Sequence, residues 1–210
     1  MFTGIITGLG RITGVQPLGD SASHGKRLTI QCPPTYLDDV TPGDSIALNG
    51  ACMTTTTLDT AAHQFTVDIS AESLARTAGL GELGPINLEK AMRANDRLGG
   101  HMVSGHVDGM GQITRFEQVG ESWLLAVLAP PQLSKYLAFK GSITVNGVSL
   151  TINSVQDVDA GCLITINLIP HTLENTTLGT LHEGSRVNLE IDLIARYVER
   201  MLSPSVESAA

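Results

Sequence analysis

Short runs in which apolar and polar residues alternate recur along the chain, and they predict β-strands. In the first half such runs lie at 27–30, 45–48, 65–69 and 86–88, and they are rich in Thr, Val and Ile. Asn49-Gly50 separates two strand-like segments, as a tight hairpin turn requires. About six short strands are expected in this half, which is typical of a small closed Greek-key barrel without exposed sheet edges.

The same pattern of strands and turns returns in the second half because the chain contains an internal duplication. The segment 1–13 reappears at 102–114 with Met, three Gly, Ile and Thr at matching places. Further blocks keep their order along the chain, and Asn146-Gly147 is the counterpart of Asn49-Gly50. A repeat this long indicates a duplicated domain with its own core and excludes a solenoid.

The sequence therefore predicts an all-β protein. It consists of two tandem six-stranded antiparallel Greek-key barrels, related by the duplication, and a C-terminal α-helix. The expected boundaries are 1–97 and 98–192 for the barrels, 193–203 for the helix and 204–210 for a disordered tail.

Three stretches interrupt the strand pattern and predict helical segments. One follows each Pro-Pro pair, around 36–40 and 133–139, and the third runs over 193–202, where Pro204 ends it. The third carries one apolar stripe, formed by Leu193, Ile194, Tyr197, Val198 and Met201. The stripe could pack against its own barrel or form a contact between subunits, and the pattern alone leaves both open.

Composition narrows the expected partner to a small molecule. A net charge of −8 with scattered Lys and Arg argues against a nucleic-acid surface. No apolar run reaches the length of a membrane span, and the first residues lack the regions of a secretory signal. The three cysteines form no disulfide framework, which favours a reducing, cytoplasmic location.

No known cofactor or metal signature is found in the sequence. The main candidates for chemistry are polar residues at matching places of the two repeats. Cys52 follows the first hairpin turn and Ser149 follows the second, so two similar pockets would be chemically unequal. Cys52 could also be an ordinary buried cysteine.

Two other groups of polar residues have both a structural and a functional interpretation. The segments 68–73 and 167–172 match each other, and their side chains could cap turns or bind a polyol chain. His101 and His106 lie beside a Gly-rich joint between the repeats, where they could be structural or move protons.

Together these blocks resemble riboflavin synthase of the α-chain type, which has two lumazine-binding domains. The resemblance is carried by MFTGII at 1–6, NGACMT at 49–54, GGHMVSGH at 99–106, NGVSLT at 146–151 and LIPHTL at 168–173. It spans both repeats. His171 stands where the family usually has Glu, which affects one contact to the ribityl chain.

The resemblance implies a dismutation that needs no cofactor or metal. One molecule of 6,7-dimethyl-8-ribityllumazine gives a four-carbon unit to a second, which yields riboflavin and 5-amino-6-ribitylaminouracil. It also implies a homotrimer held by the C-terminal helix. The active site then forms between the N-terminal barrel of one subunit and the C-terminal barrel of a neighbour, with two substrate molecules in each site and no nucleic acid or membrane as partner.

Carried over by position, the resemblance implies one substrate pocket in each barrel. The first is expected to be lined by Gly4, Ile5, Ile6, Ser45, Cys52, Met53, Thr54, Asp68, Ile69, Ser70, Ala71, Glu72 and Ser73. The second is expected to be lined by Gly105, His106, Val107, Lys140, Ser149, Leu150, Thr151, Asn167, Leu168, Ile169, Pro170, His171 and Thr172. Phe2 is expected to pack against the ring or to shape the interface.

The expected roles follow from the residue types. Cys52, or a water bound to it, would add to or polarise the acceptor lumazine. Ser149 with Thr151 would stabilise the donor carbanion, and His101 or His106 would move protons. Asp192, just before the C-terminal helix, is a further candidate for substrate binding and proton transfer.

Two other functions fit part of the pattern. A non-catalytic lumazine- or flavin-binding antenna protein shares the duplicated fold but needs only one good pocket. Both halves here keep their Thr after the hairpin turn, and Cys52 is present, which favours the enzyme. A flavin-binding barrel of a reductase would need a nicotinamide-binding domain, for which the remaining sequence has no room.

Overall fold

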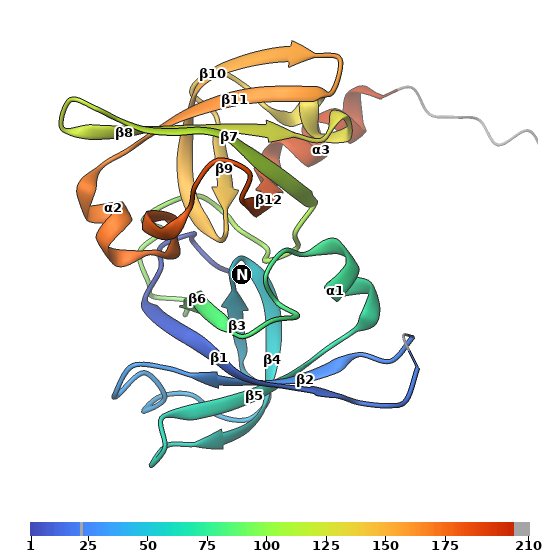
Figure 1. The fold of residues 1–210 in the computed structure, drawn as a ribbon, viewed down its shortest axis with the longest axis vertical. Coiled ribbons are helices and arrows are strands. Elements are labelled where there is room, and N and C mark those ends of the chain that lie inside the picture. The colour runs from blue at the N-terminus through green and yellow to red at the C-terminus, as the bar shows by residue number, and fades with distance from the viewer. Residues whose placement is uncertain (22, 204–210) are drawn as a thin grey trace, which may run out of the picture.

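Each half of the chain closes into a six-stranded antiparallel barrel, as the alternating pattern predicts (Figure 1). The computed structural model describes residues 1–21 and 23–203. The first barrel has the hydrogen-bonded order β1-β2-β5-β4-β3-β6. Its strands are β1 (Gly8–Pro17), β2 (Lys26–Gln31), β3 (Ser45–Leu48), β4 (Ala51–Asp59), β5 (Gln64–Ile69) and β6 (Gly84–Lys90).

The second barrel repeats this topology in the order β10-β11-β8-β7-β12-β9. Its strands are β7 (Gly109–Val119), β8 (Ser122–Ala129), β9 (Ser142–Val145), β10 (Val148–Val158), β11 (Gly161–Leu168) and β12 (Arg186–Ile191). The register shifts between Ile12 and Gly14 on β1, and between Ile113 and Arg115 on β7. The duplication therefore preserves even the irregularities that curve the sheets.

The helical segments agree with the sequence only in part. The predicted C-terminal helix is α3 (Leu193–Leu202), and the predicted segment at 133–139 is the 3₁₀ helix η1 (Pro131–Tyr136). The expected helix at 36–40 is wrong: this stretch is a series of turns. Thr35 adopts a left-handed conformation (φ 66°), and the backbone hydrogen bonds from Asp38 to Thr35 and from Val40 to Leu37 span only three residues. The expected tail at 204–210 lies outside the described residues.

Three short segments were not expected as helices. They are α1 (Ala71–Arg76), α2 (Pro170–Asn175) and the 3₁₀ helix η2 (Thr177–Thr180). Each is at most six residues long, so none shows the apolar period of a longer helix. None of the helices in the described part of the chain is long and apolar enough to cross a membrane.

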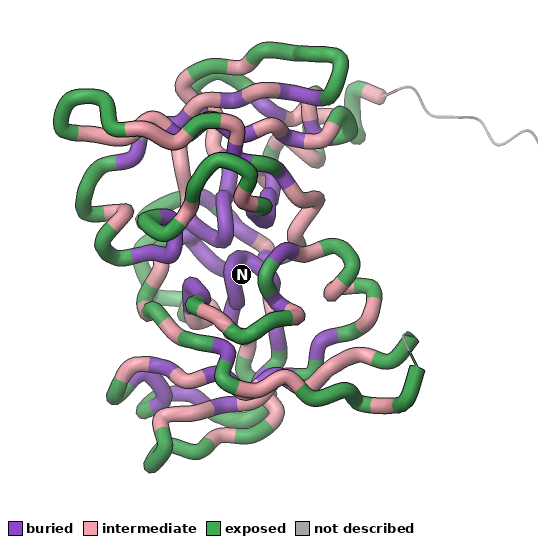
Figure 2. Tube along the Cα trace, in the orientation of Figure 1, coloured by how far each residue is buried: buried purple, intermediate pink, exposed green. Residues whose placement is uncertain are grey.

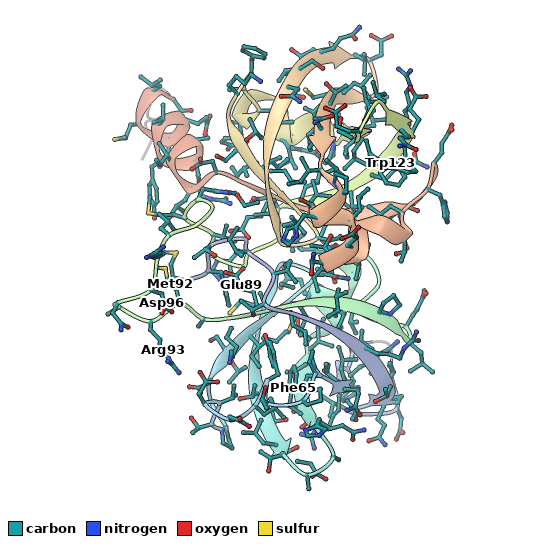
Figure 3. The ribbon with its side chains drawn as sticks, turned by 90° about the vertical axis from the view of Figure 1, so that its left-hand side faces the viewer. Phe65, Glu89, Met92, Arg93, Asp96 and Trp123 are labelled. Carbon is teal, nitrogen blue, oxygen red and sulfur yellow. The ribbon has the colours of Figure 1, made fainter. Side chains whose placement is uncertain are left out.

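Each barrel has its own apolar core, and a third, smaller cluster joins them. Phe65 lies in the first core, and Trp123 packs against the second (Figure 3). The third cluster consists of Phe2, Ala47 and Val103 at the joint between the barrels. Phe2 and Val103 form an isolated antiparallel bridge, and Figure 2 shows buried chain continuing through the joint. The two barrels are thus one packed unit.

Four buried asparagines form a pseudo-two-fold hydrogen-bond network at this joint. Within the barrels, the backbone N–H of Asn87 donates to Oδ1 of Asn49 (2.9 Å), and that of Asn188 donates to Oδ1 of Asn146 (2.8 Å). Between the barrels, Nδ2 of Asn87 donates to the carbonyl of Asn146 (2.9 Å), and Nδ2 of Asn188 donates to that of Asn49 (3.1 Å). The buried side-chain amides of Asn87 and Asn188 both donate and accept hydrogen bonds, which fixes the relative orientation of the barrels.

The hairpin glycines next to these asparagines contact each other across the joint. Gly50 and Gly147 both have positive φ (85° and 79°). A Cβ on Gly147 would lie 2.7 Å from the nitrogen of Gly50, and one on Gly50 would lie 2.9 Å from the nitrogen of Gly147. No larger residue fits either position without separating the barrels.

We predict that Gly147→Ala lowers the free energy of unfolding by roughly 2–4 kcal/mol, because it combines left-handed strain with overlap at the joint. Gly43→Ala is the matched control: Gly43 also has positive φ (98°), but no atom lies within 4 Å of the added Cβ. The control should cost about 1 kcal/mol. Urea denaturation measures both, and equal losses would contradict the role assigned to the joint.

Candidate functional site

The segment that precedes the first strand of each barrel docks on the other barrel. The carbonyl of Gly4 accepts a hydrogen bond from the backbone N–H of Ser149 (2.7 Å), and that of Gly105 accepts one from the N–H of Cys52 (2.8 Å). Ile6 packs against the core of the second barrel. Candidate residues from both repeats therefore meet at each of two sites, which we call the Cys52 site and the Ser149 site.

This crossing corrects the expected distribution of residues between the two pockets. Gly4 and Ile6 were assigned to the pocket of the first barrel but lie against the second, while Val107 packs against the core of the first barrel. Alignment of the two repeats could not reveal this crossing. It matches positions along the chain and gives no information on which barrel a connecting segment contacts.

The Cys52 site contains a cavity of about 240 Å³. It is lined by Ala51, Cys52, Met53, Glu72, Ser73, Arg76, Thr77, Gly105, His106 and Val107. The structure thus brings Cys52, Met53, Glu72 and Ser73 together with His106. Arg76 and Thr77 were missed because they lie at the end of α1, which the sequence did not predict.

The Ser149 site is organised around a hydrogen bond between Ser149 Oγ and His101 Nδ1 (2.7 Å). The backbone N–H of His101 donates to the carbonyl of Thr3 (3.2 Å), so the opening segment also holds this histidine. His101 is 8% exposed, and its Nε2 has no hydrogen-bond partner among residues 1–21 and 23–203. Burial lowers the pKa of His101 below its ordinary value, although the nearby carboxylate of Asp192 opposes the shift. A neutral imidazole beside a hydroxyl can accept its proton.

The short helices at matching places of the two repeats carry different side chains. In α1, Ser70 accepts a hydrogen bond from the N–H of Ser73, and Glu72 forms an ion pair with Arg76 (3.1 Å). In α2, the matching residues are His171 and Asn175, whose side chains are hydrogen-bonded (3.2 Å). The charged pair that lines the Cys52 cavity therefore corresponds to an imidazole and an amide in the second repeat.

Several expected pocket residues have other surroundings. Ile69 and Leu168 are buried in the barrel cores, and Leu150 packs against the second core. Asp68 pairs with Arg27 (2.7 Å), which lowers the pKa of the carboxyl group. Asn167 accepts a hydrogen bond from Ser122 (2.8 Å).

Other expected residues lie at the edges of the sites or apart from them. Phe2 is fully buried at the joint, so it shapes the interface and presents no surface to a ligand. Lys140 has positive φ (61°) and donates to Asn153 (3.0 Å). Ile5, Thr54, Ser70, Thr151, Ile169, Pro170 and His171 are exposed, as are Asp68, Glu72, His106, Lys140 and Asn167, while Ala71 and Thr172 are half-buried.

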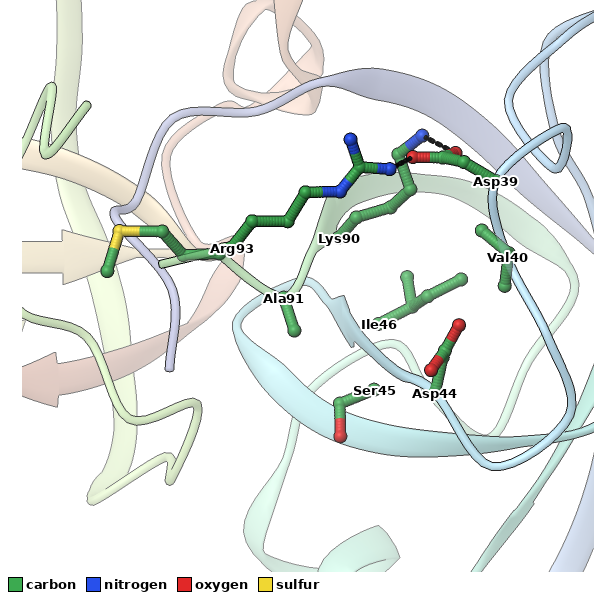
Figure 4. A pocket seen from close by; sticks show the side chains of 9 residues that line it. Asp39, Val40, Asp44, Ser45, Ile46, Lys90, Ala91 and Arg93 are labelled. Atoms are coloured by element: carbon green, nitrogen blue, oxygen red, sulfur yellow. Dashed lines mark hydrogen bonds and ion pairs between the residues drawn. The ribbon is translucent and has the colours of Figure 1, made fainter. Parts of the chain in front are cut away.

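Ser45 lines a different cavity, of about 260 Å³, between the turns at 39–44 and the residues at the end of β6 (Figure 4). There Asp39 accepts hydrogen bonds from Lys90 (2.5 Å) and Arg93. These contacts lower the pKa of Asp39 and leave both cations partnered. The cavity is separate from the residues that surround Cys52 and Ser149.

Two buried carboxylates, Glu89 and Glu190, hold the crossing segments and were missed. Glu89 accepts from the backbone N–H groups of Thr3 (2.7 Å) and Gly4 (3.0 Å), and Glu190 accepts from those of Ser104 (2.7 Å) and Gly105 (3.1 Å). Burial raises the pKa of both, against the opposing effect of these donors. The signal was an acidic residue at matching places in β6 and β12, where it is buried beside apolar residues.

Comparison with known proteins agrees with this duplicated architecture. The model of the lumazine binding domain matches residues 3–91 and again residues 104–192. The riboflavin synthase of Bacillus subtilis (strain 168) is 44% identical over 210 residues, covering 99% of this chain and 93% of that protein. The chain belongs to the riboflavin synthase family. A second family member, from Mycobacterium bovis, is 44% identical over 96% of this chain and 98% of its own length.

Two solved structures of LumP have the same fold, but LumP is less similar in sequence to this chain than the riboflavin synthases are. The crystal structure of LumP complexed with riboflavin has a TM-score of 0.78 at 26% identity, and it covers 91% of this chain and 99% of LumP. LumP complexed with 6,7-dimethyl-8-(1'-D-ribityl) lumazine has a TM-score of 0.76 at 25% identity, with the same coverage. The fold is therefore shared by proteins with quite different sequences.

We predict that His101 titrates below its ordinary value of 6.5, because the folded protein disfavours the buried imidazolium. Since the unfolded chain binds this proton more readily, His101 should reduce stability as the pH falls from 6.5 through the lowered pKa. NMR titration of the imidazole, with a histidine in an unstructured peptide as control, measures the midpoint. A midpoint at or above 6.5 would contradict the assigned environment.

Proposed function

We infer that the protein is a riboflavin synthase, which converts two molecules of 6,7-dimethyl-8-ribityllumazine into riboflavin and 5-amino-6-ribitylaminouracil. The observation that carries this inference is identity of 44% to named riboflavin synthases through both barrels. LumP shares the fold at 25–26% identity. The reaction needs two binding sites for one kind of molecule, and the duplication supplies them.

The chemistry that fits this geometry is mainly positioning of two reactants. Holding two lumazines so that a deprotonated C7 methyl group of one attacks the other contributes up to ~7–11 kcal/mol. The Cys52 and Ser149 sites present chemically different side chains to the two lumazines. His101 lies with Ser149, whereas His106 lines the Cys52 cavity, so the two histidines are assigned to different substrate molecules.

The Ser149 site is the better candidate for holding the donor carbanion. The hydroxyl of Ser149 is hydrogen-bonded to a histidine whose lowered pKa keeps it neutral, so the pair can accept and return a proton. Thr151 follows on the same strand with its side chain exposed, where it can contact the substrate. At the other site Cys52, or a water bound to it, is assigned to the acceptor, and Asp192 remains a weaker candidate for proton transfer.

The assembly we propose is a homotrimer held by α3, because this helix turns its polar side to its own barrel. Arg196 pairs with Asp108 (2.6 Å), and Glu199 accepts from Lys135 (2.5 Å) and from Tyr136 (3.2 Å). The apolar residues Ile194, Tyr197, Val198 and Met201 are 43–75% exposed. An exposed stripe of this kind is typical of a contact surface.

We predict that the protein forms one riboflavin for every two molecules of 6,7-dimethyl-8-ribityllumazine. Ser149→Ala should lower kcat by about 10²–10⁴-fold because it removes the hydroxyl of the Ser149–His101 pair, while Cys52→Ala should cause a different loss. Thr13→Ala removes a hydroxyl on β1 as a control and should leave the rate unchanged. Riboflavin formation followed by absorbance tests this.

Bound fluorescent ligand without any riboflavin would instead favour the antenna-type binding protein. Equal losses of activity in the Cys52 and Ser149 variants, with unchanged affinity at each site, would contradict unequal roles. Chemical quantification of 5-amino-6-ribitylaminouracil distinguishes transfer of the four-carbon unit from a side reaction.

We predict that Val198→Asp converts the trimer into a monomer that binds ligand with little turnover. The new charge falls in the apolar stripe, whereas the ion pairs that dock α3 on its own barrel are kept. Arg200→Ala, on the same helix but outside the stripe, is the control and should stay trimeric. Light scattering coupled to gel filtration measures the mass, and a trimeric Val198→Asp variant would contradict the assignment.

A further inference from the structure

We propose that Glu89 and Glu190 are positioning residues that act across the joint, so that each carboxylate sets the geometry of the site on the other barrel. Glu89, on the first barrel, positions the Ser149 site, and Glu190, on the second barrel, positions the Cys52 site. The consequence for catalysis rests on the proposed function, but the structural coupling does not.

Each carboxylate gathers three donors from one opening segment. Glu89 Oε1 accepts from the backbone N–H and the hydroxyl of Thr3 (2.7 and 2.8 Å), and its Oε2 accepts from the N–H of Gly4 (3.0 Å). Glu190 repeats the pattern with the N–H and hydroxyl of Ser104 (2.7 and 2.6 Å) and the N–H of Gly105 (3.1 Å). Both oxygens of each carboxylate are therefore used to fix the segment.

The glycine held in this way touches the functional residue of the opposite barrel. A Cβ on Gly4 would lie 2.6 Å from Cβ of Ser149, and one on Gly105 would lie 2.7 Å from Cβ of Cys52. Each glycine carbonyl also accepts the backbone N–H of that same residue (2.7 and 2.8 Å). A shift of the segment must therefore move Ser149 or Cys52, because no space separates them.

A carboxylate is required because only acceptors fit between these donors. Glu89 is 4% exposed and Glu190 is 2% exposed, and within residues 1–21 and 23–203 neither has an ion-pair partner. Burying an unpaired charge is unfavourable, so the hydrogen bonds must offset the loss of hydration. Gln would present an NH₂ group to the N–H of Gly4 or Gly105 and would release the glycine.

Because each carboxylate holds a segment that contacts the opposite barrel, its loss should affect that opposite barrel. A carboxylate that only stabilised its own barrel would not have this effect. If Glu89 only stabilised its own barrel, its loss would disturb the neighbouring Cys52 side of the molecule first. If it acts through Gly4, its loss must appear at Ser149. The amides of Ser149 and Cys52 are therefore two internal reporters with opposite expectations.

The experiment is residue-resolved amide hydrogen exchange by NMR on the full-length, ligand-free protein. Glu89→Gln should accelerate exchange at the Ser149 amide by at least ~10-fold and leave the Cys52 amide within about 2-fold, and Glu190→Gln should do the reverse. Thr55→Val is the control: it removes a partly buried hydrogen bond to the carbonyl of Thr41 (2.9 Å) within the first barrel and should accelerate neither reporter selectively.

Kinetics then connect the coupling to the reaction. A misplacement of about 1 Å can cost on the order of 100-fold in rate, so both Gln variants should lower kcat by about 10–100-fold with a smaller change in KM. Thr55→Val should keep kcat while lowering the thermal midpoint. If the unmodified protein forms no riboflavin, the proposed function fails, and the exchange data still decide the coupling.

The proposal is overturned if the Gln variants disturb the reporter on their own barrel, both reporters equally, or neither. If Gln prevents folding, Thr3→Val and Ser104→Ala remove one hydroxyl donor from each carboxylate and keep the backbone bonds. These variants should show the same crossed pattern with smaller changes, about 2–5-fold in exchange rate. Their failure to do so would equally refute the coupling.

Discussion

The structure depends on the hydrogen-bonded joint between the two barrels, where the amides of Asn87 and Asn188 cross to the opposite hairpins. Each barrel could close and bury a core by itself, but its candidate site could not form without the other barrel. Gly50 and Gly147 let the hairpins approach until their backbones touch. This contact brings the opening segment of each repeat onto the strand that carries Cys52 or Ser149.

The duplication gives both sites one backbone frame and leaves the side chains free to differ. Cys52 is accompanied by His106 and by the Glu72–Arg76 pair, whereas Ser149 is accompanied by His101, with His171 and Asn175 on the matching helix. A reaction between two copies of one molecule needs this combination. In the proposed reaction, the shared frame would let both sites recognise the same ligand, and the unequal groups would let one copy lose a proton while the other is attacked.

The sequence predicts the two barrels because strand alternation and the Asn-Gly turns are local signals that the duplication repeats, and it predicts the C-terminal helix from a separate local signal, the apolar stripe before Pro204. Cys52 and Ser149 became candidates because they follow the repeated Asn-Gly turns, and His101 and His106 because they lie beside the Gly-rich joint between the repeats. Sequence reasoning placed Gly4 and Gly105 on the wrong barrels, since the path of a connecting segment depends on packing between domains. Glu89 and Glu190 were passed over because a lone acidic residue in a strand has no local signature, although its repetition at matching places was visible.

Catalysis requires a rigid joint in a protein whose main task is to hold two reactants. The advantage of proximity persists only while the reacting atoms keep their separation and orientation, and an error near 1 Å removes much of it. Apolar packing alone tolerates rearrangement, whereas a buried network in which each amide and carboxylate has a fixed partner allows one arrangement. This requirement explains why polar Asn87, Asn188, Glu89 and Glu190 are buried although their desolvation is unfavourable. These groups fix the distance between two sites that neither barrel contains by itself.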